Sequence, residues 1–368
     1  MASTMVKQLQ VVVTFALTVE RAASHGSMNV PPTRASQGKA FEAADPASCF
    51  LTDPGACLWY NVGCMSGCDE CSLEGKILYI EPSDVGCAAP TEPAIPEYAR
   101  SWNIGNPSWA GDWTKYNPWR APGSAPVADP CGLASGYDGG GWDLPAGYTY
   151  MDKGTDLPPL NGTRTVWKAG GTAEVSYAIW ASHGGGVQYR LCPADEQPTE
   201  ECFQRTPLPF ATNASKIRYT DGATADVAVA AVDVSEGTLP AGSAWRRMPV
   251  PACNCDIGTG CSSLPKAEGT MSEAYARDAD AKATTPNCPT GTQFPPPAEG
   301  IYGVGGYQCT GGSTGKVPAP GACAYNFEWS IVDEVAVPDT AGRYVLQWRW
   351  DAEQTAQVWN TCADVEIE

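Results

Sequence analysis

Apolar and polar residues alternate along several short segments of this chain. Alternation with a period of two is typical of a β-strand that buries one face. The segments with this pattern are residues 173–184, 226–234, 325–337 and 343–351, and residues 362–368 form a final predicted strand. Turn-forming residues are abundant, with 39 Gly and 32 Pro, and no long stretch has the period of an amphipathic helix. The pattern predicts an all-β fold, an immunoglobulin- or fibronectin-III-like antiparallel β-sandwich.

The alternation also predicts which side chains fill the core. In the first segment, the residues that share an apolar face are Ala173, Val175, Tyr177, Ile179 and Ala181. In residues 343–351, the residues that share one face are Tyr344, Leu346, Trp348 and Trp350. Residues two positions apart point to the same side of a sheet, so we expect both sets to face the opposite sheet.

Residues 1–24 have the features of a secretory signal peptide. Lys7 supplies a positive charge, residues 9–19 are largely apolar, and residues 22–24 (AAS) provide small residues for a cleavage site. The apolar run is shorter than a transmembrane helix requires. Cleavage after Ser24 would produce a secreted, extracellular protein whose first residue is His25.

The cysteines agree with secretion. The chain has 16 of them, an even number, which indicates an oxidised protein with long disulfide-braced loops. Residues 64–71 (CMSGCDEC) also have zinc-ligand spacing, but export favours disulfides and no histidine lies nearby. Residues 253–324 are rich in Gly, Pro and Cys and lie between predicted strands, so we interpret them as a loop-like insertion. Residues 25–368 then form a single module.

Charge restricts the partners of the protein. The net charge of −18 opposes binding to nucleic acid and to anionic membranes, so a neutral partner is favoured. Asn161 and Asn213 each begin an Asn-X-Ser/Thr sequence and are candidate glycosylation sites, as expected for a secreted protein.

The chain contains only two histidines, His25 and His183. His183 follows a predicted strand and precedes a run of glycines, a position from which a side chain reaches the rim of a sandwich. If His25 is the mature N-terminus, its α-amine and its imidazole could chelate one metal ion together. A second imidazole from His183 would give a three-nitrogen set that suits copper. The amine must lose its proton to bind, so affinity should fall with acid.

Four segments in order resemble the lytic polysaccharide monooxygenases, in particular the chitin-binding type-4 group and its animal, algal and oomycete relatives. They are HGSMNVPPTRAS (25–36), NPWRAPGSAPVADPCG (117–132), WASHGGGVQYRLCP (180–193) and WRWDAEQTAQVWNTCADVEI (348–367). They span most of the mature chain, although residues 253–324 have no counterpart in the family pattern.

The resemblance implies a function and a set of site residues. His25 and His183 would hold one copper ion, Ala181 would leave room beside it, and Gln357 would position the oxygen co-substrate. Trp359 stands where the family usually has Tyr or Phe at the axial position; the other interpretation of Trp359 is core packing. The implied reaction cleaves an insoluble polysaccharide, with chitin favoured over cellulose. It hydroxylates C1 or C4, using H2O2 or O2 and an external electron donor.

Aromatic residues outside the strand patterns are candidates for substrate binding. Trp59, Tyr60, Trp109 and Trp113 could stack on sugar rings if their faces are exposed, although most tryptophans in such a fold fill the core.

Three other functions stay open. The protein could bind copper without catalysis, or bind chitin or cellulose without copper, on the same fold. A pair of carboxylates could hydrolyse a glycosidic bond, but acidic residues are too numerous for any pair to stand out. Whichever function applies, we expect the protein to act as a monomer.

Overall fold

The structure is a computed structural model. It describes residues 25–36, 59–62, 122–123, 127–134, 136, 148–160, 164–182, 184–219, 222–235, 238–250, 297, 307–308, 324–325, 329–352 and 357–368. The predictions that involve residues 1–24, and almost all of 253–324, lie outside these residues.

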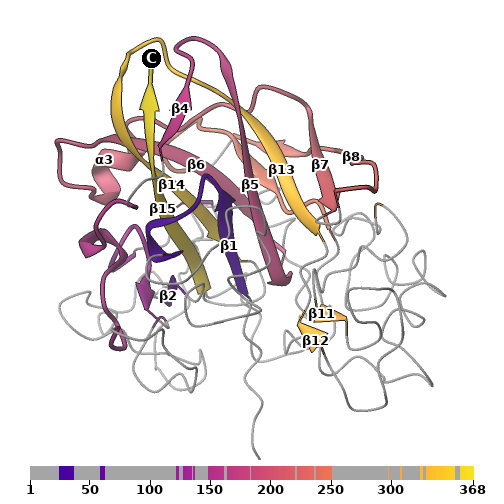
Figure 1. Ribbon diagram of the computed structural model, residues 1–368, viewed down its shortest axis with the longest axis horizontal. Helices are drawn as coiled ribbons and strands as arrows, with labels where there is room; N and C mark the ends of the chain where they lie inside the picture. Colours follow the sequence, from indigo (N-terminus) through magenta and orange to yellow (C-terminus); the bar gives the residue numbers. More distant parts are fainter. Residues whose placement is uncertain are drawn as a thin grey trace, which may run out of the picture.

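Two β-sheets face each other in this part of the chain (Figure 1). The five-stranded sheet has the order β1 (His25–Val30), β5 (Thr172–Ala181), β13 (Trp329–Ala336), β7 (Ala214–Tyr219) and β8 (Val227–Ala230). All its neighbouring strands are antiparallel. The predicted antiparallel β-sandwich is therefore confirmed.

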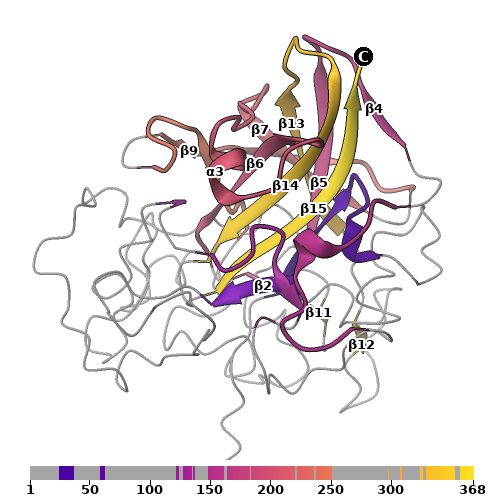
Figure 2. The same ribbon diagram turned by 90° about the vertical axis from the view of Figure 1, so that its left-hand side faces the viewer.

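The second sheet is larger and contains the longest strands. Its order is β3 (Leu133–Ala134), β2 (Trp59–Val62), β15 (Gln357–Ile367), β14 (Gly342–Asp351), β6 (Gly186–Pro193), β10 (Trp245–Arg247) and β9 (Asp233–Val234). An eighth strand, β4 (Thr165–Trp167), runs parallel to the end of β15. Figure 2 shows β14 and β15 side by side, with β2 against the opposite end of β15 from the C-terminus.

The remaining described elements are short. They are the helix α3 (Glu200–Gln204), the 3-10 turns η1 (Arg34–Ser36) and η5 (Gly154–Asp156), and the strand pair β11 (Tyr307–Gln308) and β12 (Ala324–Tyr325). None of the helices in the described residues is long and apolar enough to cross a membrane.

The predicted apolar faces meet in the core between the sheets. Val175, Tyr177 and Ile179 of β5 pack in one buried cluster with Leu346, Trp348 and Trp350 of β14. One prediction was wrong in detail: residues 226–234 form two strands rather than one. β8 belongs to the five-stranded sheet and β9 to the eight-stranded sheet, where it pairs with β10. The chain changes sheets at Ala231 and Val232 although the alternation continues, and Asp233 on β9 then binds the buried guanidinium of Arg246 on β10.

The outward side chains of β14 are also buried, although they are polar. Gln347, Arg349 and Asp351 lie at 0–2% exposure, beneath loops and α3. Arg349 binds Asp351 at 2.7 Å and Glu200 of α3 at 2.7 Å, and Glu200 also binds Arg190. The result is a buried polar layer on the outer face of the eight-stranded sheet, which we call the outer ion-pair layer (Arg190, Glu200, Arg349 and Asp351).

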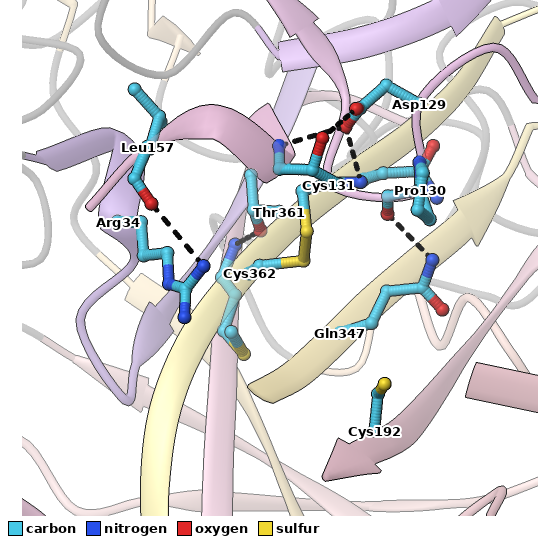
Figure 3. Close-up of a disulfide and its surroundings, with 12 residues drawn as sticks. Arg34, Asp129, Pro130, Cys131, Leu157, Cys192, Gln347, Thr361 and Cys362 are labelled. Atoms are coloured by element: carbon cyan, nitrogen blue, oxygen red, sulfur yellow. Dashed lines mark hydrogen bonds between the residues drawn. A yellow bond between two sulfur atoms is a disulfide. The ribbon is translucent and has the colours of Figure 1, made fainter. Parts of the chain in front are cut away.

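Two disulfides join described residues. Cys131 bridges to Cys362 in the middle of β15, and Cys192 bridges to Cys202 in α3. Figure 3 shows the Cys131–Cys362 bond with Asp129 and Gln347 around it, where the Gln347 amide donates to the Pro130 carbonyl at 2.7 Å. The bond attaches residues 127–134 to the outer face of the larger sheet.

Asp129 lies beside this bond and is buried, and among the described residues no basic side chain forms an ion pair with it, although the charge of Lys153 is close enough to act on it. Its carboxylate accepts hydrogen bonds from the Cys131 amide at 2.8 Å, the Thr155 hydroxyl at 2.5 Å and the Thr155 amide at 3.2 Å. Burial disfavours the charged form more than these bonds favour it, and the pKa of Asp129 rises to about 6.

This raised pKa predicts a pH-dependent stability. Between about pH 4 and pH 6 the folded state holds a proton that the unfolded state has lost, so the unfolding free energy falls as pH rises. Asp129→Asn keeps an acceptor for the two amides and a donor for the Thr155 hydroxyl but carries no charge. We expect the variant to lack this decline and to exceed the wild type by up to about 3 kcal/mol at pH 7. Urea unfolding at pH 4, 5, 6 and 7 measures the free energy of unfolding of both proteins. The same dependence on pH in wild type and variant would contradict the prediction.

Candidate functional site

The candidate site begins where β1 enters the five-stranded sheet. His25 pairs with Ala181 of β5, and a register shift follows between His25 and Gly26. The side chains of His25 and Ala181, and all of His183, lie outside the described residues. The backbone nevertheless places the first residue of the predicted mature chain opposite the residue two positions before His183.

Gly26 allows β1 to lie directly on the core tryptophans. A Cβ atom at this position would be 3.1 Å from the Cε3 and Cζ3 atoms of Trp350 and 3.2 Å from Cη2 of Trp348. Separations this short are tighter than ordinary van der Waals contact. Only glycine fits without displacing the rings, so the residue that follows His25 is seated against Trp350.

Trp350 also binds the segment that contains His183. Its indole N–H donates to the carbonyl of Gly184 at 2.8 Å. Gly184 has a φ of 67°, in the left-handed region that favours glycine, as expected for the glycine turn after β5. The same tryptophan therefore contacts the residue that follows each histidine, although the two histidines are far apart in the sequence.

Two further contacts hold the N-terminal segment against the larger sheet. The Met28 amide donates to the Thr361 hydroxyl of β15 at 3.3 Å. Arg34 binds the carboxylate of Asp364 through two nitrogens, at 2.6 and 3.0 Å, and is buried. Paired hydrogen bonds between a guanidinium and a carboxylate fix direction as well as distance. Met28 and Arg34 thus both attach the N-terminal segment to β15.

Trp359 lies next to Trp350 on the neighbouring strand. The two residues pair between β14 and β15, and their ring centroids are 6.4 Å apart. Trp359 is fully buried and stacks on Tyr60 at 4.6 Å. It therefore packs in the core, which was one of the two interpretations of this residue. Gln357 pairs with Val62 at the same end of β15, and its side chain lies outside the described residues.

The predicted substrate-binding role of Trp59 and Tyr60 is wrong. Trp59 is 0% exposed and packs with Ala134 and Leu157, and Tyr60 is 2% exposed beneath Trp359. Tyr60 lies in the core between the sheets and Trp59 packs on the opposite face of β2, so neither ring presents a free face to a sugar.

The structure says less about the other predicted site residues. Trp109, Trp113 and Asn161 lie outside the described residues. Asn213 is exposed at the start of β7, where a glycan has room, and glycosylation there stays a prediction.

A copper site that uses His25 and His183 requires the segments around the two histidines to lie close together. The Trp350 ring packs against Gly26 at the start of β1, and its N–H binds Gly184 in the turn that follows β5, so one side chain contacts both segments. An N-terminal amine and two imidazoles, all nitrogen donors, are chemically suited to copper. Among the residues described, no group of three His, Cys, Asp or Glu side chains lies close enough to hold a metal ion.

Sequence reasoning missed the part that Trp350 and the two glycines play at this site. The strand alternation predicts Trp350 as a core residue, and the sequence gives no sign that it contacts Gly26 and Gly184. The signal available was the glycine directly after each histidine, which marks a close approach or a left-handed turn.

Comparison with protein-family models and with curated proteins found no match for this chain.

Proposed function

We propose that the processed chain is a secreted, copper-dependent lytic polysaccharide monooxygenase. One observation supports it above the others: Trp350 contacts both Gly26 and Gly184, the residues that follow the only two histidines. A metal site shared by the two histidines requires these two segments to lie close together, and both contacts are consistent with that requirement.

The roles of the residues follow from the donor set. The α-amine and imidazole of His25 and the imidazole of His183 would hold the ion, and they bind only when deprotonated. Bound copper supplies the one-electron redox chemistry for oxidative cleavage at C1 or C4, with an external electron donor and H2O2 or O2. Gln357 would orient the oxygen co-substrate by a hydrogen bond, and buried Trp359 would keep water from the core side of the site. Chitin is the first candidate substrate and cellulose the second.

The test uses secreted protein whose N-terminus is confirmed as His25 by mass spectrometry. Copper-loaded protein with ascorbate and hydrogen peroxide is incubated with chitin and with cellulose, and oxidised oligosaccharides are measured. We expect products from one polymer, and background levels from two matched controls. The first control is His183→Ala; the second retains one additional residue before His25, which moves the free amine away from the imidazole.

The outcomes separate the competing functions. Tight three-nitrogen copper binding without oxidised products would favour a copper-binding protein, and retention on chitin or cellulose without copper would favour a plain polysaccharide binder. Equal product from wild type and His183→Ala, or a mature chain that begins elsewhere, would refute the proposal.

A further inference from the structure

Trp350 is the described side chain that touches both halves of the candidate copper site. We propose that it is a positioning residue, which holds the backbone after His25 and the backbone after His183 at a fixed separation. This inference rests on the proposed function, because a shared copper site is the reason that the separation between these two backbone segments matters.

The first contact is made by the six-membered ring of the indole. A Cβ atom added at residue 26 would lie 3.1 Å from Cε3 and from Cζ3 of Trp350. The ring therefore packs directly against the backbone of β1. His25 is one residue away, and a chain fixed at Gly26 leaves it few backbone positions. The ring therefore limits where the N-terminal amine can go.

The second contact is made by the indole nitrogen. Its N–H donates to the Gly184 carbonyl at 2.8 Å, a bond within the normal range for an N–H donor. Trp is the aromatic residue that combines a large apolar surface with a ring N–H donor, so phenylalanine would lose the bond and leave a smaller ring surface facing Gly26. The bond fixes the turn immediately after His183.

Trp350 is itself held from both faces of its sheet. On the inner face Trp348 and Trp359 lie at centroid separations of 6.3 and 6.4 Å. On the outer face the flanking residues Arg349 and Asp351 belong to the outer ion-pair layer. Asp351 also accepts from the Gly123 amide at 2.9 Å. A ring supported in this way is preorganised rather than mobile, which is what a site of fixed geometry requires.

The consequence is a specific effect on copper. Groups that orient metal ligands without touching the metal typically contribute about 10- to 100-fold in affinity. Trp350→Phe is expected to weaken Cu(II) binding by about this factor and to change the Cu(II) electron paramagnetic resonance spectrum. The matched control is Trp167→Phe, because Trp167 fills the same core but lies on β4, at the far end of β15.

The experiment measures three quantities on processed protein: thermal stability without copper, Cu(II) affinity by competition, and the resonance spectrum. We expect both variants to lose stability, and only Trp350→Phe to lose affinity and change its spectrum. Affinity and spectrum equal to those of Trp167→Phe would overturn the inference while leaving the proposed function intact. Wild-type protein without a three-nitrogen copper spectrum would overturn both.

A second variant covers the case in which Trp350→Phe does not fold. Gly26→Ala keeps the indole N–H but pushes β1 from the ring, and its added methyl group is small. We expect it to weaken Cu(II) binding by about tenfold with a folded apo-protein. Unchanged affinity in this variant would count against the inference.

Discussion

Replacing Cys131 and Cys362 together by alanine is expected to lower the free energy of unfolding by about 5 kcal/mol. The bond closes a span of 231 residues, and a cross-link over a longer span removes more conformational entropy from the unfolded chain. In the folded state the same bond ties residues 127–134 to β15. Denaturant unfolding of the variant and the wild type under oxidising conditions measures the difference.

The Cys192–Cys202 disulfide provides the matched control. It closes only 10 residues, so its removal by two alanines is expected to cost about 3 kcal/mol. The order of the two losses is the prediction: the long-span bond contributes more. Equal losses, or a larger loss for the short span, would show that native contacts at the bonds outweigh the entropy of the unfolded chain.

Glu200→Gln is expected to destabilise the fold by about 3–5 kcal/mol. Glu200 binds both Arg190 and Arg349, which are fully buried, and glutamine would leave Arg190 without a carboxylate partner. Uncompensated buried charge is costly because water cannot solvate it. The matched control is Glu196→Gln, since Glu196 pairs with Arg205 at the exposed surface and should change stability by less than about 1 kcal/mol.

The same residue predicts the response to acid. Burial alone would raise the pKa of Glu200, but the charges of Arg349 and Arg190 outweigh it and lower the pKa to about 2. A depressed pKa in the folded state stabilises the protein above pH 4.5, and this contribution is lost as pH falls toward 2. Wild-type protein should therefore lose stability over this window more steeply than Glu200→Gln. Parallel acid unfolding curves would rule out this role.

Much of the sandwich could be predicted because strand alternation is a local pattern. Val175, Tyr177 and Ile179 face the core as their spacing predicts, and so do Leu346 and Trp348. The outer face of β14 could not be predicted in the same way. Alternation indicates that Arg349 and Asp351 point away from the core. Whether solvent or another part of the chain covers that face depends on tertiary contacts.

The candidate site likewise combines features that are local in the sequence with contacts that are not. The two histidines and the motifs around them are visible in the sequence, whereas the contacts of Trp350 join residues 166 or more positions apart. Trp59 and Tyr60 show the reverse error. Their position outside a strand pattern suggested exposed aromatics, yet β2 is a four-residue strand between β3 and β15 in which both rings are buried, one on each face of the sheet.

The order of the strands has a consequence for how this protein can vary among species or be engineered. β10 belongs to one sheet and β13 to the other, so the chain between Arg247 and Trp329 is a crossover rather than a hairpin. A hairpin must keep a set length to preserve its register, but a crossover has no such constraint, and doubling a flexible loop costs only about 0.6 kcal/mol. A change in the length of the connection between β10 and β13 therefore leaves the strand register of both sheets unchanged.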